Sequence, residues 1–274
     1  MKRLILIFSA FALLLNWTTT IRASTLAQDR QEVGAARVLP AIVQVGVAGG
    51  SAAIRTVGTG VIIKDNGYIL TAKHNVSGSM HVFVRLADGT KYPAIYYIAD
   101  AHRDLALLRV MPKTPLPVVE VGDSDALKPG QEILVFGFPA SSLIHGNSNT
   151  ATVSRGIVSA LERELEESSG TLEAEKTQDQ PVQWGTHRGA DPLAGMGRVL
   201  IKHLFQIDAM MNPGSSGGAV TTLDGKLVGI CHSMISNTGG NVGLNFAVAI
   251  NEAEILLTLA GVEGGKTDEQ QGDR

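Results

Sequence analysis

The chain has 274 residues, of which 44% are hydrophobic and 18% are charged, and its formal net charge is −3. This composition is typical of a globular protein and excludes the disordered and fibrous classes. Because the net charge is slightly negative and no basic patch stands out, the sequence argues against a nucleic-acid partner.

The first 23 residues have the pattern of an export signal. Lys2 and Arg3 form a basic start, residues 4–15 are a nearly unbroken apolar run, and Ala23 offers a cleavage position. The run is shorter than the ~20 apolar residues that cross a bilayer. We therefore predict an exported protein, periplasmic or secreted, with no integral membrane domain after signal cleavage. An uncleaved membrane anchor is the alternative.

Short strand-like runs alternate with turn residues after this segment. The first series, predicted to form a barrel within residues 34–125, comprises 41–47, 60–63, 68–71, 81–86, 94–98 and 105–110. The second series, predicted to form a barrel within residues 126–262, comprises 132–138, 151–160, 199–207, 218–222, 226–230 and 243–248. The pairs Asn66-Gly67, Asp88-Gly89 and Asp224-Gly225 stand between apolar runs and predict hairpins.

Two series of about six strands predict an all-β fold, because closing each sheet into a barrel removes its exposed edges. We expect two six-stranded antiparallel barrels, a helix at 251–260 and a polar tail at 263–274. The Pro-rich stretch 111–117 is interpreted as a linker. Residues 162–198, which begin with several glutamates, are interpreted as a surface insertion. It is either a solvated loop or a loop that gates substrates or binds a partner.

The single cysteine, Cys231, lies at the end of the apolar run 227–231. One cysteine cannot form an internal disulfide, so we expect the core to supply the stability of the fold. No acid–base partner stands beside Cys231 apart from His232, so we interpret it as a core residue and not as a nucleophile.

Three segments carry side chains suited to nucleophilic catalysis. Ser216 lies in the glycine-rich run 212–218, where backbone N–H groups can approach a substrate oxygen. His74 follows a predicted strand, and Asp104 precedes another. A buried carboxylate needs a partner for its charge, and a histidine N–H is such a partner. The order His, Asp, Ser along the chain is that of chymotrypsin.

This pattern alone leaves alternatives open. Asp100, His102 and Asp208 lie near the candidate segments and could replace one of the three residues, and Ser215 is a rival nucleophile.

The sequence resembles the trypsin-like peptidase domain of the HtrA (DegP/DegQ) serine protease family, which implies that the two barrels are of the chymotrypsin/trypsin-like kind. The matching stretches are 58–63, 67–71, 104–108, 122–124, 156–160 and 206–218. It departs from the family pattern at Ser215, where Asn is usual, and in the long segment 162–198. HtrA proteins carry PDZ domains after the protease, whereas only residues 249–274 follow Val248 here. We therefore expect a protease domain without a PDZ domain.

The resemblance implies roles for individual residues. It selects Asp104, directly before Leu-Ala-Leu, and Ser216, directly before Gly-Gly, so the predicted triad is His74, Asp104 and Ser216. The backbone N–H groups of Gly214 and Ser216 would form the oxyanion hole. The implied activity is serine endopeptidase, acting on polypeptides that include unfolded proteins in extracytoplasmic quality control, and the implied assembly is a homotrimer. A non-catalytic chaperone or binding module on the same fold is the alternative.

The resemblance also suggests a specificity pocket. In trypsin an aspartate six residues before the nucleophile binds Lys or Arg, and here that position is Met210. The uncharged residues predicted to line the pocket, and therefore to favour cleavage after aliphatic residues, are Met210, Met211, Ser233, Met234 and Ile235. A pocket histidine, as in glutamyl endopeptidases, would make His232 a rival. Its offset by Cys231 counts against this, because a one-residue shift in a strand reverses the side chain.

Metal chemistry is not expected from the sequence. It contains no His-Glu-x-x-His run and no Cys–His set with zinc spacing, so we predict neither a metal nor another cofactor.

Overall fold

The computed structural model of the protein describes residues 29–48, 54–79, 81–139, 149–168, 198–235 and 242–264. The predicted signal, residues 1–23, and most of the predicted tail, residues 265–274, lie outside the described residues. Within the described ranges, no helix combines the length and apolarity that crossing a membrane requires.

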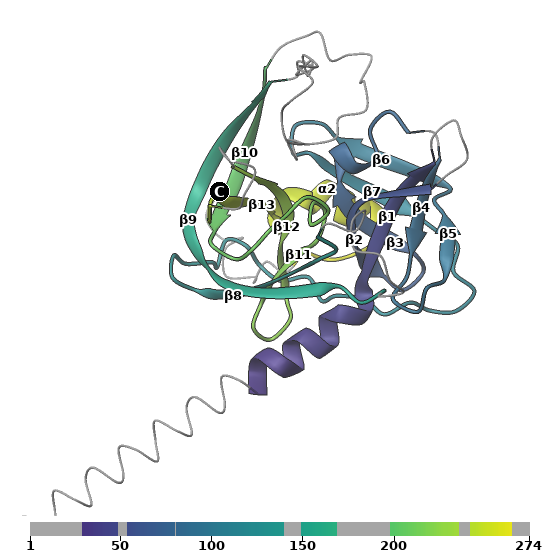
Figure 1. Cartoon of the computed structure of the whole chain (residues 1–274), viewed down its shortest axis with the longest axis horizontal. Helices are drawn as coiled ribbons and strands as arrows, with labels where there is room; N and C mark the ends of the chain where they lie inside the picture. Colours follow the sequence, from purple (N-terminus) through teal and green to yellow (C-terminus); the bar gives the residue numbers. More distant parts are fainter. Residues whose placement is uncertain are drawn as a thin grey trace, which may run out of the picture.

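The first half is an antiparallel sheet of seven strands, drawn in purple to blue in Figure 1. A helix at residues 29–38 precedes it. Its strands pair in the order β5-β4-β1-β2-β3-β7-β6. The elements are η1 (Leu39–Ala41), β1 (Ile42–Ala48), β2 (Ile54–Lys64), β3 (Tyr68–Ala72), η2 (Lys73–Asn75), β4 (Val82–Arg85), β5 (Lys91–Pro93), β6 (Tyr96–Asp100) and β7 (Leu105–Arg109).

The second half is a closed barrel of six strands in the order β10-β13-β12-β11-β8-β9, followed by a short helix (Figure 1). The elements are β8 (Glu132–Gly137), β9 (Thr152–Ser168), β10 (Arg198–Ile207), β11 (Ala219–Thr222), β12 (Leu227–Met234), β13 (Asn245–Ala249), η3 (Ile250–Ala253) and α2 (Glu254–Ala260).

The all-β prediction of two barrel-like halves with a C-terminal helix is confirmed, and the three predicted hairpin turns lie between consecutive strands. The strand count differs in the first half, which has seven strands where six were expected. The additional strand is β5, which has three residues and pairs with β4 at one end of the strand order. It is short and ends in proline, a combination that edge strands tolerate and that gives no hydrophobic alternation to detect.

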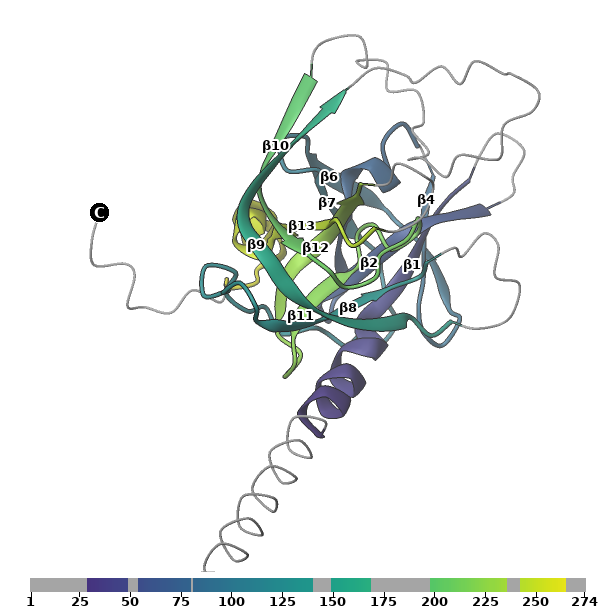
Figure 2. The ribbon, with the colours of Figure 1, turned by 60° about the vertical axis from the view of Figure 1, so that its left-hand side comes forward.

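The prediction of a loop beginning at Glu162 is wrong for residues 162–168. These residues continue β9 and pair with β10, so that Leu200 lies opposite Glu166 and Ile201 opposite Leu165. Leu165 packs against the main hydrophobic cluster, which explains why the ladder continues through a glutamate-rich stretch. The resulting two-stranded arm extends beyond the rest of the barrel (Figures 1 and 2). Residues 169–197 lie outside the described residues.

Two hydrophobic clusters form the core. The larger one joins residues of both halves with α2, for example Ile62 and Leu107 with Phe136 and Leu257. The smaller one fills the second barrel and includes Cys231. Burial raises the pKa of the Cys231 thiol to about 12, so the thiol stays protonated at neutral pH. This agrees with a core role for Cys231 and not with a nucleophile.

Candidate active site

The site lies where β3 and β7 of the first half meet β12 of the second. Ala72, the last residue of β3, pairs with Leu105, the first residue of β7. The residues just beyond these two strand ends therefore lie side by side. His74 lies in η2 directly after β3, and Asp104 directly precedes β7. Register thus brings together two residues that are 30 positions apart in sequence.

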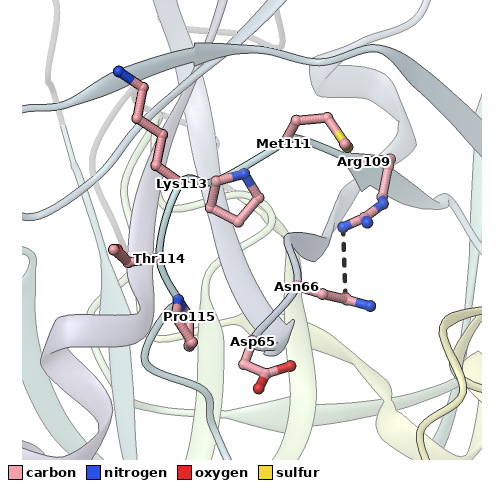
Figure 3. Close-up of a pocket in the computed structure, with 8 residues that line it drawn as sticks. Asp65, Asn66, Arg109, Met111, Lys113, Thr114 and Pro115 are labelled. Atoms are coloured by element: carbon pink, nitrogen blue, oxygen red, sulfur yellow. Dashed lines mark hydrogen bonds between the residues drawn. The ribbon is translucent and has the colours of Figure 1, made fainter.

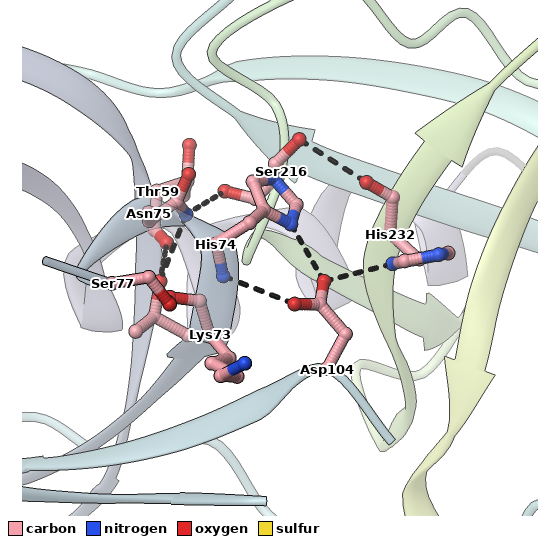
Figure 4. A network of polar contacts seen from close by, with 9 residues as sticks. Thr59, Lys73, His74, Asn75, Ser77, Asp104, Ser216 and His232 are labelled. Carbon is pink, nitrogen blue, oxygen red and sulfur yellow. Dashed lines mark hydrogen bonds and ion pairs between the residues drawn. The ribbon is translucent and has the colours of Figure 1, made fainter. Parts of the chain in front are cut away.

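Figure 4 shows that the Asp104 carboxylate holds His74 at two points. The backbone N–H of His74 donates to Asp104 Oδ1 over 3.0 Å, and His74 Nδ1 lies 2.6 Å from Asp104 Oδ2. The carbonyl of Asp104 accepts a hydrogen bond from the backbone N–H of Lys73. These bonds fix the imidazole so that Nδ1 faces the carboxylate and Nε2 faces away from it.

Asp104 is buried and has a left-handed backbone conformation, with φ of 51°. Such a backbone is uncommon for a residue other than glycine, and it clusters at functional sites. Burial alone would raise the pKa of the Asp104 carboxyl. The charge of His74 and hydrogen bonds from His232 and His74 outweigh that effect and hold the pKa well below its usual range. The carboxylate is therefore ionised at neutral pH and can only accept hydrogen bonds.

Ser216 lies in the glycine-rich loop between β10 and β11. Gly214 and Gly217 have φ of 100° and 82°, so the loop needs glycine at both positions. The Ser216 hydroxyl donates to the carbonyl of His232 over 3.2 Å. Among the described residues, the Ser216 hydroxyl makes this hydrogen bond and none with the imidazole of His74. To pass its proton to His74, Ser216 Oγ must exchange this bond for one to His74 Nε2.

Ser215 is turned away from the site. It is buried, and its hydroxyl accepts a hydrogen bond from the backbone N–H of Asn212 over 3.3 Å. This caps the loop, as expected if Ser216 and not Ser215 is the nucleophile.

The predicted oxyanion-hole donors have no competing acceptor among the described residues. Within the part of the chain that the structure describes, neither the Gly214 N–H nor the Ser216 N–H donates to a protein group, whereas the Ser215 N–H between them binds the Asn212 carbonyl. The two N–H groups are therefore available for a substrate oxygen, which is the arrangement an oxyanion hole needs.

The carbonyls of the same loop are tied to the first half. Thr59 donates through its hydroxyl to the carbonyl of Gly214 over 2.7 Å and through its N–H to the carbonyl of Ser216 over 2.9 Å. The Asn75 side-chain amide also donates to the Ser216 carbonyl, over 2.8 Å. Because these bonds fix the carbonyls on one side of the loop, they hold its N–H groups toward the site. Thr59 and Asn75 were not identified from the sequence, since each bond joins residues more than 80 positions apart.

His232 is the third residue whose place in the site the sequence did not predict. Its Nδ1 lies 3.0 Å from Asp104 Oδ2, and its side chain is 0% exposed (Figure 4). It is therefore not at the surface as the base of a glutamate pocket would be. The only signal in the sequence was the position of His232 after Gly-Ile-Cys, which indicated a rival pocket residue and not a partner of Asp104.

The competing candidates lie elsewhere. Asp100 forms an ion pair with Arg103, and His102 is exposed. Asp208 is exposed and accepts a hydrogen bond from the backbone N–H of Ile157. Among the described residues, none of the three contacts His74 or Ser216.

The predicted pocket residues differ in exposure. Met210 is 60% exposed and Ile235 39% exposed, whereas Met211 is buried in the smaller hydrophobic cluster. Ser233 and Met234 are partly exposed at the end of β12. These side chains thus range from buried to exposed, and their role in specificity stays a prediction.

His74, Asp104 and His232 also form a set of potential metal ligands, with one ligand atom of each within 4.8 Å of the others. Atoms that bind one tetrahedral zinc at 2.0–2.1 Å lie about 3.3 Å apart. The two contacts to Asp104 Oδ2, at 2.6 and 3.0 Å, are hydrogen-bond distances instead. The geometry favours shared protons over a metal ion.

A separate depression of about 280 Å³ lies at the other end of the same strands (Figure 3). It is lined by Asp65, Asn66 and Arg109 and by residues 111–115. Tyr68 pairs with Arg109 there, four residues along β3 and β7 from the Ala72–Leu105 pair. At 3.2–3.4 Å per residue the two places are about 13 Å apart. The depression is therefore not part of the His74 site.

Comparison with known proteins agrees with this geometry. The trypsin-like peptidase domain family matches residues 58–230. The chain belongs to this family. The magnetosome formation protease MamE of Paramagnetospirillum magneticum is 33% identical over 207 residues, which are 74% of this chain and 24% of MamE. The periplasmic serine endoprotease DegP of Escherichia coli K12 is 31% identical over 202 residues, which are 73% of this chain and 35% of DegP. The resemblance to the HtrA/DegP proteases is confirmed.

Solved structures give the same result. The HtrA-type protease AlgW, determined with a tripeptide, superposes with a TM-score of 0.61 at 27% identity, covering 86% of this chain and 65% of AlgW. The curated relatives are longer proteins, and this chain spans 24% of the length of MamE and 35% of that of DegP.

Proposed function

We propose that the protein is a serine endopeptidase that uses His74, Asp104 and Ser216. The observation that carries this proposal is the His74–Asp104 pair, held by two hydrogen bonds beside a serine whose loop presents two uncommitted N–H groups. That combination supplies the base, its orienting carboxylate, the nucleophile and the oxyanion donors that acyl transfer needs.

The reaction follows from the roles of these groups. Ser216 Oγ rotates to His74 Nε2, transfers its proton there and attacks the substrate carbonyl carbon. The N–H groups of Gly214 and Ser216 stabilise the oxygen as it becomes negative. His74 then protonates the leaving amine, and Asp104 stabilises the imidazolium in between. Water repeats the sequence on the acyl-enzyme, which releases the acid product and restores Ser216.

The nucleophile can be tested directly. We expect an aryl phosphonate probe to label Ser216, with the modified peptide located by mass spectrometry, and Ser216→Ala to lose at least about 1,000-fold in kcat, because the acyl-enzyme cannot form. Ser215→Ala is the matched control and should keep most of the activity, since its hydroxyl caps the loop. A Ser216→Ala variant that hydrolyses casein at the wild-type rate would exclude this mechanism. A folded wild type that neither reacts with the probe nor hydrolyses casein would favour the chaperone or binding module.

We also propose that cleavage follows aliphatic residues. The side chains next to the nucleophile loop and at the end of β12 are uncharged, so a Lys, Arg or Glu at the cleaved position would lose hydration without gaining a counter-charge. Val, Ala, Leu or Met would gain about 25 cal/mol for each Å² of apolar surface buried. Mass spectrometry of a digested denatured protein should show mainly cuts after these residues. A majority of cuts after Lys, Arg or Glu would contradict the pocket assignment.

The relatives support further proposals about the whole protein. DegP is named a periplasmic serine endoprotease, and we propose that this chain acts outside the cytoplasm on unfolded polypeptides as a homotrimer. Fractionation of cells should place it in the periplasm or the medium. Analytical ultracentrifugation should give three times the monomer mass, and a monomer at micromolar concentration would contradict the assembly.

A further inference from the structure

His232 occupies an irregular position in β12. Cys231 pairs with Ala247 of β13 and Ser233 pairs with the neighbouring Phe246, so His232 is the extra residue of a β-bulge. A bulge turns a side chain out of the regular alternation, and bulges are common beside active sites. The Cys231 and His232 side chains are consequently both buried instead of one facing outward. His232 is thereby aimed across the junction at Asp104.

The residue contacts two members of the proposed triad. Its Nδ1 lies 3.0 Å from Asp104 Oδ2, and its carbonyl accepts the hydrogen bond of the Ser216 hydroxyl over 3.2 Å. Because an ionised carboxylate only accepts, both Nδ1 atoms that face Oδ2 must carry protons. Asp104 Oδ2 therefore shares its negative charge between His74 and His232.

We propose that His232 is a positioning residue of the active site, which fixes the Asp104 carboxylate and limits how strongly it stabilises protonated His74. The inference rests on the proposed function of the His74–Asp104–Ser216 site and adds a fourth side chain to it. His74 supplies two of the three donors to the carboxylate, through its backbone N–H and its ring, and His232 supplies the third from β12 of the second half.

The surroundings of the three residues contain few other charges. Of the elements packed against β12, neither β11 nor β13 carries a titratable side chain, and β3 carries only Tyr68 at its far end. Glu252 of η3 is paired with Arg103, which also binds Asp100. The remaining titratable groups near the site are Lys73 and His74 of η2, Asp104, and Cys231 beside His232. Among the described residues, His74 and His232 are the titratable side chains that bond to the Asp104 carboxylate.

The consequence is a shift in the pH range of activity. If the His232 N–H is removed, His74 alone neutralises Asp104 Oδ2, so its protonated form is held more tightly. The general base must be neutral to act, and the acid limb of kcat/KM therefore moves to higher pH. His232 thus extends activity toward acid. Its loss also removes the carboxylate donor that comes from the second half, which we expect to loosen the Asp104–His74 pair and lower kcat.

Two variants separate this role from simple packing. His232→Leu fills a similar volume without an N–H. We expect the midpoint of the acid limb to rise by about 0.5–1 pH unit and kcat to fall about 3- to 10-fold. Both effects correspond to part of the free energy of one charge-assisted hydrogen bond. His232→Asn places an amide N–H near the position of Nδ1, and it should return the midpoint to within about 0.2 pH unit of wild type.

Cys231→Ala is the control, because Cys231 precedes His232 in β12 and is equally buried but faces the smaller cluster. It should lower thermal stability without moving the acid limb. If His232→Leu leaves the limb unchanged, or if Cys231→Ala moves it equally, the positioning role is excluded.

A second measurement does not depend on activity. Proton NMR of the wild type should show two far-downfield N–H resonances, from His74 and His232, both absent in Asp104→Ala and only one retained in His232→Leu. Only one resonance in the folded wild type would overturn the shared carboxylate. If both resonances are present while the protein cleaves no peptide, the proposed function fails and the His232–Asp104 bond stands.

Discussion

At the scale of single residues, the Asp104 carboxylate has the largest energetic consequence. It is buried and accepts hydrogen bonds from the His74 backbone, the His74 ring and the His232 ring. Breaking a buried ion pair by removing one partner typically costs about 3–5 kcal/mol, because the other partners are left unpaired. The group that orients the base is therefore also a structural group.

This predicts a pH-dependent loss of stability in Asp104→Asn. Because folding lowers the pKa of Asp104, the ionised group stabilises the fold above the unfolded value of about 3.9, and this stabilisation is lost as the pH falls below it. Urea unfolding should show Asp104→Asn about 3 kcal/mol less stable than wild type at pH 7, with a difference that shrinks at pH 3. The exposed residue Asp125 gives the control variant Asp125→Asn, expected within about 0.5 kcal/mol of wild type. A difference that grows on going from pH 4 to pH 3 would contradict the direction of the shift.

At the scale of elements, the nucleophile loop is shaped by how closely it approaches the first half. A Cβ at Gly217 would clash with the Thr59 carbonyl and the Thr71 hydroxyl. These two groups are bonded to one another, since the Thr71 hydroxyl of β3 donates to the Thr59 carbonyl of β2. The loop can therefore reach Thr59 and Asn75 only with glycine at this position.

Replacing Gly217 by alanine tests this approach. We expect Gly217→Ala to lower the free energy of unfolding by about 1–2 kcal/mol through the left-handed backbone, and by a further amount through the clash. We also expect kcat/KM to fall at least about 100-fold as the proposed oxyanion donors move. Gly130→Ala is a matched control, because Gly130 has φ of 83° but nothing within 4 Å of a Cβ there. Gly130→Ala should lower the free energy of unfolding only by the backbone penalty and should keep its activity. Equal stability and activity in the two variants would mean that the close contact has no role.

The elements also show what the sequence could and could not predict. His74 and Asp104 adjoin strands with strong apolar patterns, and Ser216 lies in a glycine-rich run, so local patterns made all three candidates. The family resemblance then selected Asp104 and Ser216 over their neighbours. The bond from Asn75 to the Ser216 carbonyl joins residues 141 positions apart, and no local pattern encodes it. His232 was unpredictable for a different reason, since a bulge breaks the alternation on which strand predictions depend.

At the scale of the whole molecule, the two halves share one core. The larger hydrophobic cluster includes Leu70 and Leu107 of the first half and Phe136 and Ile230 of the second. The last helix, α2, returns to the first half, where Lys64 Nζ donates to the carbonyl of Gly261 over 2.7 Å. Sequence patterns placed a boundary near residue 125 because the two strand series are separate along the chain. The packing that joins them is long-range and leaves no such pattern.

A shared core predicts that the halves unfold together. Leu257 of α2 is 2% exposed in the larger cluster, so Leu257→Ala should lower the free energy of unfolding by about 2–5 kcal/mol. Leu259, two residues later, is 50% exposed, and Leu259→Ala should change it by less than about 0.5 kcal/mol. In Leu257→Ala, hydrogen exchange should show the same fall in the free energy of opening at amides of β3 and of β11. Calorimetry should give a single unfolding transition. A loss confined to β3, or two transitions, would mean that each half folds alone. The proposed triad, with two residues in one half and one in the other, would then depend on docking of the halves and not on a common core.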